Sequence, residues 1–183
     1  MVSAKGNFKQ IKFLLIFLSI YMLFIYNTGF AQQDKNNNQK LSNDSALIMR
    51  RMMIHSRSHM VMPFNMNKVT HYFIKTKSGG VLMIKAKNPK DTVQINLIRM
   101  HLKKEHALFS NANFKDPKTL HGMNMPGLKV LSKSKGKFKV TYNELKDGAK
   151  LTFVSFHPGV IKALHIWFNA QLKDHGKDAR SHL

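Results

Sequence analysis

The feature that most constrains the fold is an order of elements that occurs twice along the chain. In its first occurrence, two runs rich in β-branched and aromatic residues, 70–77 and 81–86, flank a short turn that contains Gly79. Because glycine supplies the positive φ of a tight turn, this pattern predicts a β-hairpin. Asp91 is suited to cap the helix that follows, and apolar residues then recur at helical spacing to about residue 109.

The second occurrence begins at residue 138 and repeats the β-run, the glycine turn, the second β-run and the helix. A shift of 69 residues superposes a turn glycine, a proline and a histidine: Gly79 on Gly148, Pro89 on Pro158, and His106 on His175. This agreement indicates a ββα duplication. Each hairpin alone would expose its apolar face. We therefore expect an α+β domain with one four-stranded antiparallel sheet and two main helices on one face.

A signal for export precedes this pattern. Three lysines, the last of them Lys12, lead into an apolar run over 13–26, and small residues then close the segment at Ala31. This order predicts a secretory signal peptide over residues 1–31, cleaved after Ala31. A membrane-spanning helix needs about 20 apolar residues, which is longer than this run. We expect a periplasmic or secreted protein, and an uncleaved anchor in the inner membrane is the alternative.

Composition divides the rest of the chain into four segments. Residues 32–48 contain few apolar side chains and are expected to be a disordered linker. Residues 49–68 are a lead-in segment rich in methionine and histidine, residues 69–176 the single α+β domain, and residues 177–183 a flexible tail. A hydrophobic content of 43% is enough for one packed core and not for two.

Two histidines of the lead-in segment are candidate metal ligands. His55 and His59 are four residues apart, which places both on one face of a helix, among several methionines. Imidazole and thioether ligands together suit Cu(I). Methionine is also an adaptable packing residue, so the alternative is a stretch that packs on the core or lies on a membrane surface.

The charge balance indicates contact with anionic surfaces. The chain has 30 Lys and Arg against 9 Asp and Glu, and without the three lysines of the leader it keeps 27 − 9, or +18. Such a charge favours phospholipid head groups or cell-wall polymers, and a solvated lysine-rich surface is the alternative. We do not expect a nucleic-acid partner, since the lysines are spread evenly without interleaved aromatic residues. The absence of cysteine excludes disulfides and thiolate metal ligands.

Several motifs together resemble a small family of exported bacterial proteins. They are MPF at 62–64, THYF at 70–73, LIRMHL at 97–102, HGMNMPGL at 121–128, DGAK at 147–150 and HIWFNAQLKDHG at 165–176. Members are often labelled aspartate carbamoyltransferase, a label that implies carbamoyl-phosphate chemistry. This chain lacks the Ser-Thr-Arg-Thr phosphate-binding segment of that enzyme and is too short for its two α/β domains. We therefore attribute the label to a naming error.

The candidate site is a metal centre built from residues far apart in the sequence. Alternation along the first strand places His71 inward, and a helical stripe places His165 and His175 on one face. If the connection between the two units folds back, its histidine and methionines join them. The expected ligands of copper or zinc are His71, His121, Met125, His165 and His175, with Met123 as a further candidate.

A second group would orient these imidazoles, and Asp174 or a backbone carbonyl is suited to that role. The alternative is that each inward histidine is structural and bonded to the main chain. Nothing in the sequence predicts catalysis, because it contains no GxSxG, P-loop or dinucleotide-binding fingerprint and its carboxylates fall mostly at turns and caps. We therefore expect an exported envelope protein that binds copper or zinc. A basic envelope-associated module with structural histidines is the first alternative, and the transferase of the family label is the second.

Overall fold

The computed structural model describes the backbone of residues 7–183, and for residues 7–31 it describes the side chains of Met22, Ile25 and Tyr26 alone. The first six residues of the predicted signal peptide, and the side chains around its predicted cleavage site, lie outside the described residues. The chain divides into two compact units, Met1–Leu47 and Ile48–Leu183.

The described part of the first unit is helical throughout. Helix α1 (Asn7–Arg57) begins there and covers residues 32–48, for which we predict a disordered linker. The helix is continuous because residues 32–61 contain neither proline nor glycine, the two residues least compatible with a helix interior. Its residues 32–46 are all exposed, in keeping with their polar composition. Among the residues described, no helix is both long and apolar enough to cross a membrane.

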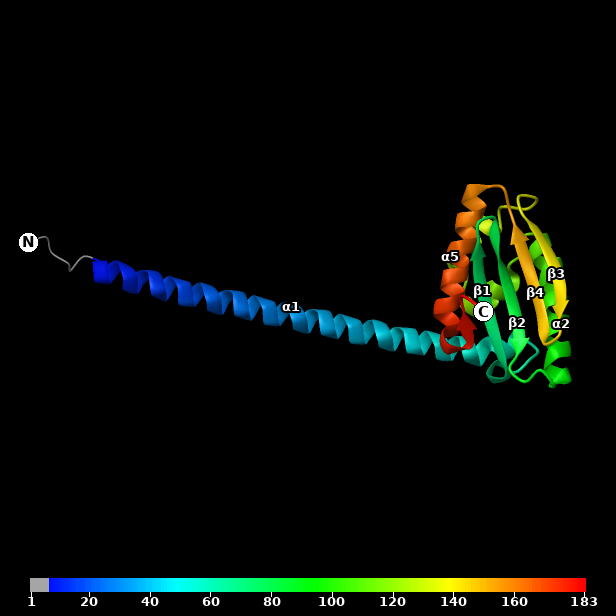
Figure 1. Cartoon of the computed structure of the whole chain (residues 1–183), viewed down its shortest axis with the longest axis horizontal. Coiled ribbons are helices and arrows are strands. Elements are labelled where there is room, and N and C mark those ends of the chain that lie inside the picture. Colours follow the sequence, from blue (N-terminus) through cyan, green and yellow to red (C-terminus); the bar gives the residue numbers. More distant parts are fainter. Residues whose placement is uncertain (1–6) are drawn as a thin grey trace, which may run out of the picture. The chain divides into compact units, whose positions relative to one another are not determined.

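The second unit is built on a five-stranded mixed sheet (Figure 1), which confirms the predicted α+β class. The strands are β1 (Val69–Thr76), β2 (Gly79–Ala86), β3 (Lys139–Leu145), β4 (Gly148–Val154) and β5 (Ala179–Arg180). Their order is β3-β4-β2-β1-β5. The four long strands pair antiparallel, as predicted, with each hairpin formed by strands adjacent in sequence.

The short strand β5 corrects the four-stranded prediction. Gly176 ends the last long helix with a φ of +56°, and the 3-10 turn η3 (Gly176–Asp178) returns the chain to the sheet. There Ala179 pairs in parallel with His71 of β1. Part of the predicted flexible tail is therefore ordered, because the outer main-chain groups of β1 offer hydrogen bonds to a further strand.

Two long helices cover one face of the sheet. The helices of the second unit after β2 are α2 (Thr92–Ser110), α3 (Lys115–His121), α4 (Leu128–Leu131) and α5 (Pro158–His175). Asp91 caps α2 as predicted, because its side chain accepts a hydrogen bond from the Gln94 N–H. Phe153 of β4 contacts Phe109 of α2. It also contacts Trp167 of α5, so both helices lie on the face to which the Phe153 ring points.

The lead-in segment is part of the domain core. It comprises the end of α1 and the 3-10 turns η1 (Ser58–Met60) and η2 (Met66–Lys68). Its buried apolar side chains are Ile54, Met62, Phe64 and Met66, all members of the hydrophobic core cluster. The compact domain therefore begins at Ile48 and not at Val69.

The two hairpins depend on glycines at equivalent positions, Gly79 at the start of β2 and Gly148 at the start of β4. A Cβ atom at Gly148 would lie 2.0 Å from the carbonyl oxygen of Ile84 on the neighbouring strand. We expect Gly148→Ala to lower the free energy of unfolding by about 1–3 kcal/mol, measured by urea denaturation. Gly159→Ala is the control, since a Cβ there meets no atom within 4 Å. An equal loss in both variants would contradict close strand packing as the cause.

Candidate functional site

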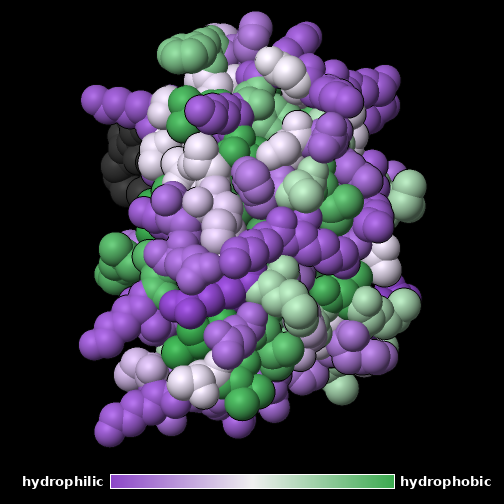
Figure 2. All heavy atoms as spheres, turned by 90° about the vertical axis from the view of Figure 1, so that its right-hand side faces the viewer, coloured by the Kyte–Doolittle hydropathy of each residue, from purple (hydrophilic) through white to green (hydrophobic). Residues whose placement is uncertain are grey.

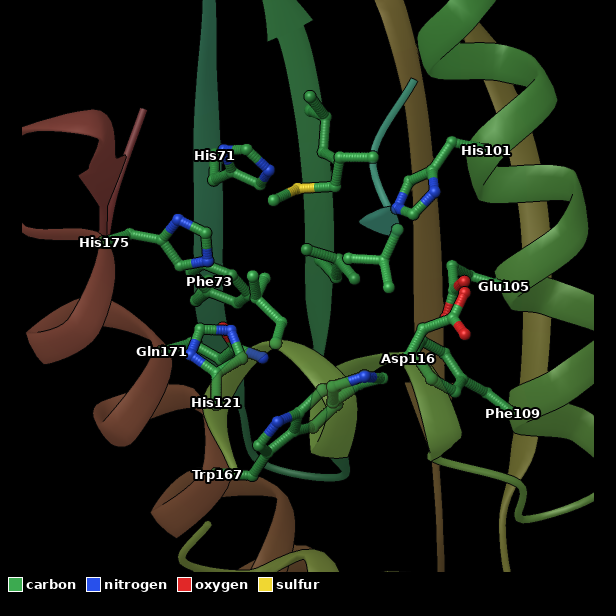
Figure 3. A pocket seen from close by; sticks show the side chains of 16 residues that line it. His71, Phe73, His101, Glu105, Phe109, Asp116, His121, Trp167, Gln171 and His175 are labelled. Carbon is green, nitrogen blue, oxygen red and sulfur yellow. The ribbon is translucent and has the colours of Figure 1, made fainter. Parts of the chain in front are cut away.

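A small cavity lies between the sheet and the helices, with a volume of about 50 Å³ and polar groups set among apolar side chains. Four histidines line it, one each from β1 and α3 and two from the long helices. A buried water needs about 10–15 Å³ of such volume, so the cavity holds only a few atoms. Figure 3 shows two groups of polar side chains facing one another across it. We call His71, His121 and His175 the histidine wall, and His101, Glu105 and Asp116 the carboxyl wall.

Strand and helix periodicity explain why these side chains converge. Residues of β1 alternate, so His71 and Phe73 are buried on the helix-covered face while their neighbours are less buried. On α5, Trp167, Gln171 and His175 follow one another at intervals of four and form a stripe that faces the cavity. On α2, His101, Glu105 and Phe109 form a second stripe with the same spacing.

The rings of the histidine wall are in mutual contact. The ring centres of His71 and His175 are 4.7 Å apart and nearly parallel, with an interplanar angle of 24°. The ring centres of His121 and His175 are 5.3 Å apart, with an angle of 64°. All three side chains are buried. The structure therefore brings together three of the five imidazole and thioether ligands that the sequence predicts.

Asp174 orients one of these rings, as the sequence predicts for that residue. The Nδ1 of His121 donates to Asp174 Oδ2 over 2.9 Å. Arg50 also holds this carboxylate, with Nε and Nη2 at 2.6 and 2.7 Å from its two oxygens. Burial opposes ionisation of Asp174, but the hydrogen bonds from His121 and Arg50 prevail and lower its pKa to about 2. The carboxylate thus fixes the His121 proton on Nδ1, which leaves Nε2 as the nitrogen that a ligand can reach.

The imidazoles of His71, His101 and His175 carry no charge at neutral pH. Burial, reinforced by the neighbouring His121, lowers the pKa of His175 to about 3. Burial and the other histidines lower the pKa of His71 well below its usual value. Burial and Lys104 lower the pKa of His101 to about 4. A neutral imidazole with a free lone pair is the form that binds a metal ion or accepts a hydrogen bond.

The carboxyl wall contains an acid that keeps its proton. Glu105 is only 2% exposed, and burial together with the adjacent Asp116 raises its pKa to about 9. The Asp116 carboxylate is paired with Lys104, whose Nζ lies 2.6 Å from Oδ2. A protonated Glu105 can donate its hydrogen to Asp116, whereas two carboxylates could only repel one another. Sequence reasoning missed this pair, and the available signal was the His101-Glu105-Phe109 spacing on one helical face.

Polar atoms around the cavity lack partners within the described part of the protein. They are Nδ1 of His71, His101 and His175, both carboxyl oxygens of Glu105, Nε1 of Trp167 and Oε1 of Gln171. Glu105 in its protonated form can donate to Asp116, and its oxygens still receive no hydrogen bond from the described residues. Buried polar groups are rarely left unpaired, since each costs about 1–3 kcal/mol. Their concentration at one cavity makes this cavity the candidate binding site.

The other predicted ligands lie elsewhere. His165 bonds through Nε2 to the carbonyl oxygens of Thr76 and Gly79, at 3.1 and 2.9 Å, and so holds the β1–β2 turn. Met125 is buried but does not line the cavity, and Met123 is 74% exposed. The exposed His55 and His59 line a separate surface hollow beside Pro63. As the side chains stand, no group of three or more His, Asp or Glu residues in the described chain surrounds a point that could hold a metal ion.

Comparison with known proteins gives this site no counterpart: no family model, no curated protein and no solved structure matches the chain. The resemblance drawn from the sequence motifs therefore stays an expectation, and the cavity's own geometry carries the functional argument.

Proposed function

We propose that this chain is a binding protein that takes a transition-metal ion, copper or zinc, into the interior of its domain at the histidine wall. The observation that carries the proposal is the contact of three buried imidazoles beside a cavity at which several further polar atoms have no partner among the described residues. Imidazole nitrogens are favoured ligands of both metals. His121 has in addition the carboxylate partner that metal-binding histidines commonly use.

The spacing of His175 from His71 and from His121 suits a shared ion, whereas the present orientation of the rings does not. Imidazoles bound through nitrogen to one tetrahedral ion have ring centres about 5 Å apart, given bonds of about 2.0–2.1 Å. The ring centre of His175 lies 4.7 Å from that of His71 and 5.3 Å from that of His121, and both separations match that value. The stacked pair His71 and His175 must rotate about their side-chain bonds so that both lone pairs point to one place. The small cavity provides the space for this rotation.

The test uses untagged full-length protein, stripped with a chelator and dialysed against Zn²⁺ or against Cu⁺ under reducing conditions. We expect about one ion per wild-type chain. Removing one ligand, as in His71→Gln or His175→Gln, should lower the affinity by about tenfold or more. Trp167 is the only tryptophan of the chain and lines the cavity, so its emission should change on Zn²⁺ binding.

The matched control is the double variant His55→Gln/His59→Gln, which removes two exposed imidazoles outside the cavity. It should retain the ion and the emission change. Substoichiometric metal in the wild type, or loss of metal in the surface variant alone, contradicts the proposed site.

A second proposal concerns the surface and the location of the protein. Hydrophilic side chains predominate on the face shown in Figure 2, with hydrophobic ones scattered between them. Together with 30 Lys and Arg against 9 Asp and Glu, this supports association with an anionic envelope surface after export. If the metal test fails, we propose instead that the protein is a basic envelope-associated module whose histidines are structural. An assay with carbamoyl phosphate and aspartate tests the transferase label.

A further inference from the structure

The carboxyl wall faces the same cavity as the histidine wall but has no place in ligation by the three imidazoles. Both carboxyl oxygens of Glu105 are buried, and the described protein offers them no hydrogen-bond donor. Across from them lie the unpaired Nδ1 atoms of His71 and His175 (Figure 3). A carboxyl group that is buried without a cation partner needs either a proton or a positively charged neighbour.

The charged groups around Glu105 explain why this carboxyl group keeps its proton. His101 and Lys104 lie on its own helix, and Lys115 and Asp116 come from α3. Lys104 forms an ion pair with Asp116, with Nζ 2.6 Å from Oδ2. Glu105 therefore has a carboxylate as its neighbour and forms no ion pair with a cation of the described residues. Lys115 is exposed, so solvent screens it. The pair of carboxyl groups therefore holds one proton between them while the cavity contains no cation.

We propose that Glu105 is the charge-compensating group of the cavity, which keeps a proton while no cation is bound and releases it when a cation enters. This inference rests on the proposed metal binding. The step breaks the O–H bond of Glu105 and delivers the proton to solvent, and no electrons are transferred. The resulting carboxylate lies in the same low-dielectric space as the ion, where opposite charges stabilise each other much more strongly than in water.

The experiment counts protons released when Zn²⁺ binds to the full chain. Calorimetric titrations in two buffers of different ionisation enthalpy give this count. Wild type should release about one proton more per ion than Glu105→Gln, because the variant keeps every other titrating group and lacks only this carboxyl group. The Zn²⁺ dissociation constant of the wild type should fall about tenfold for each unit by which the pH rises between about pH 6 and 8. That of Glu105→Gln should fall much less.

The control is Glu144→Gln, which removes an exposed glutamate that pairs with Arg99 and Lys103 outside the cavity. It should release protons as the wild type does. If Zn²⁺ binds to wild type and Glu105→Gln with equal proton release, the inference is overturned while the proposed metal site stands. If no variant binds Zn²⁺, the proposed site and this inference both fall.

A second measurement tests Glu105 without any metal. The infrared spectrum of the ion-free protein at neutral pH should contain the carbonyl band of a protonated carboxyl group. That band should be absent from Glu105→Gln and present in Glu144→Gln. Identical spectra for wild type and Glu105→Gln at neutral pH would overturn the inference, whatever the metal titrations show.

Discussion

The free energy of unfolding of the domain is expected to fall by several kcal/mol when the pH is lowered from about 7 to about 4.5. Burial lowers the pKa of His71, His101 and His175 in the folded state, the last two to about 4 and about 3. The unfolded chain binds protons at these imidazoles below its own pKa of about 6.5, and the folded chain does not. The contribution of these imidazoles to stability is therefore complete above that value and is lost as the pH falls. Each of His101 and His175 accounts for about 2 kcal/mol at about pH 4.5.

Urea denaturation followed by far-UV circular dichroism at several pH values measures this loss. His175→Gln removes one titrating group, so its free energy of unfolding should depend on pH less steeply, by up to about 1 kcal/mol per pH unit. His59→Gln leaves the buried imidazoles in place and should keep the wild-type dependence. Asp174 does not contribute to this pH dependence. Its pKa of about 2 means that its contribution to stability is lost only in more acidic solution. In Glu105→Gln, which lacks the opposing titration of that carboxyl group, a stability that stays constant down to about pH 5 would rule out buried neutral imidazoles.

The free energy of unfolding should also fall as the pH rises above neutrality. Here the folded chain, and not the unfolded chain, holds the extra proton. Burial and the neighbouring Asp116 raise the pKa of Glu105 to about 9. Between about pH 4.5 and 9 the unfolded chain has released this proton while the folded chain keeps it, so the free energy of unfolding falls as the pH rises. The slope is about 1.4 kcal/mol per pH unit, or on the order of 3 kcal/mol from about pH 6.5 to 8.5.

Glu105→Gln should remove most of this alkaline loss, because the amide does not titrate and can donate to Asp116 as the protonated acid does. The variant should therefore be more stable than wild type at about pH 8.5, which is unusual for a change at a buried position. The comparison variant Glu144→Gln should show the wild-type slope. Parallel curves for wild type and Glu105→Gln would show that Glu105 ionises in the folded protein. Taken together, the acid and alkaline effects place the maximum of stability near neutral pH.

Local sequence signals predicted most of the fold. The turns at Gly79 and Gly148 fixed both hairpins, and Asp91 marked the start of α2, because turn and cap chemistry depends on a few adjacent residues. The order β1-β2-α2 recurs as β3-β4-α5, while the duplication behind it stays a prediction. Strand β5 could not be predicted, since Ala179 pairs only because an edge of β1 is present.

The candidate site was predictable where periodicity decides the direction of a side chain. Strand alternation placed His71 inward, and helical spacing placed His175 on the covered face. Helical spacing also put His165 on that face, but this residue lies at its margin and binds the main chain of the β1–β2 turn. The Glu105–Asp116 pair escaped prediction because it joins two helices, and the path of the connection between them is a tertiary property.

The contact between Arg50 and Asp174 has a practical consequence for preparing the domain. A fragment that starts at the first strand would lose this guanidinium, which also donates to the carbonyl oxygen of His121 over 3.0 Å. It would lose four apolar side chains of the core as well, among them Ile54 and Phe64. A truncated form should therefore be expressed from a residue upstream of Ile48. The end of α1 supplies Arg50, which holds the Asp174 carboxylate that orients the His121 ring.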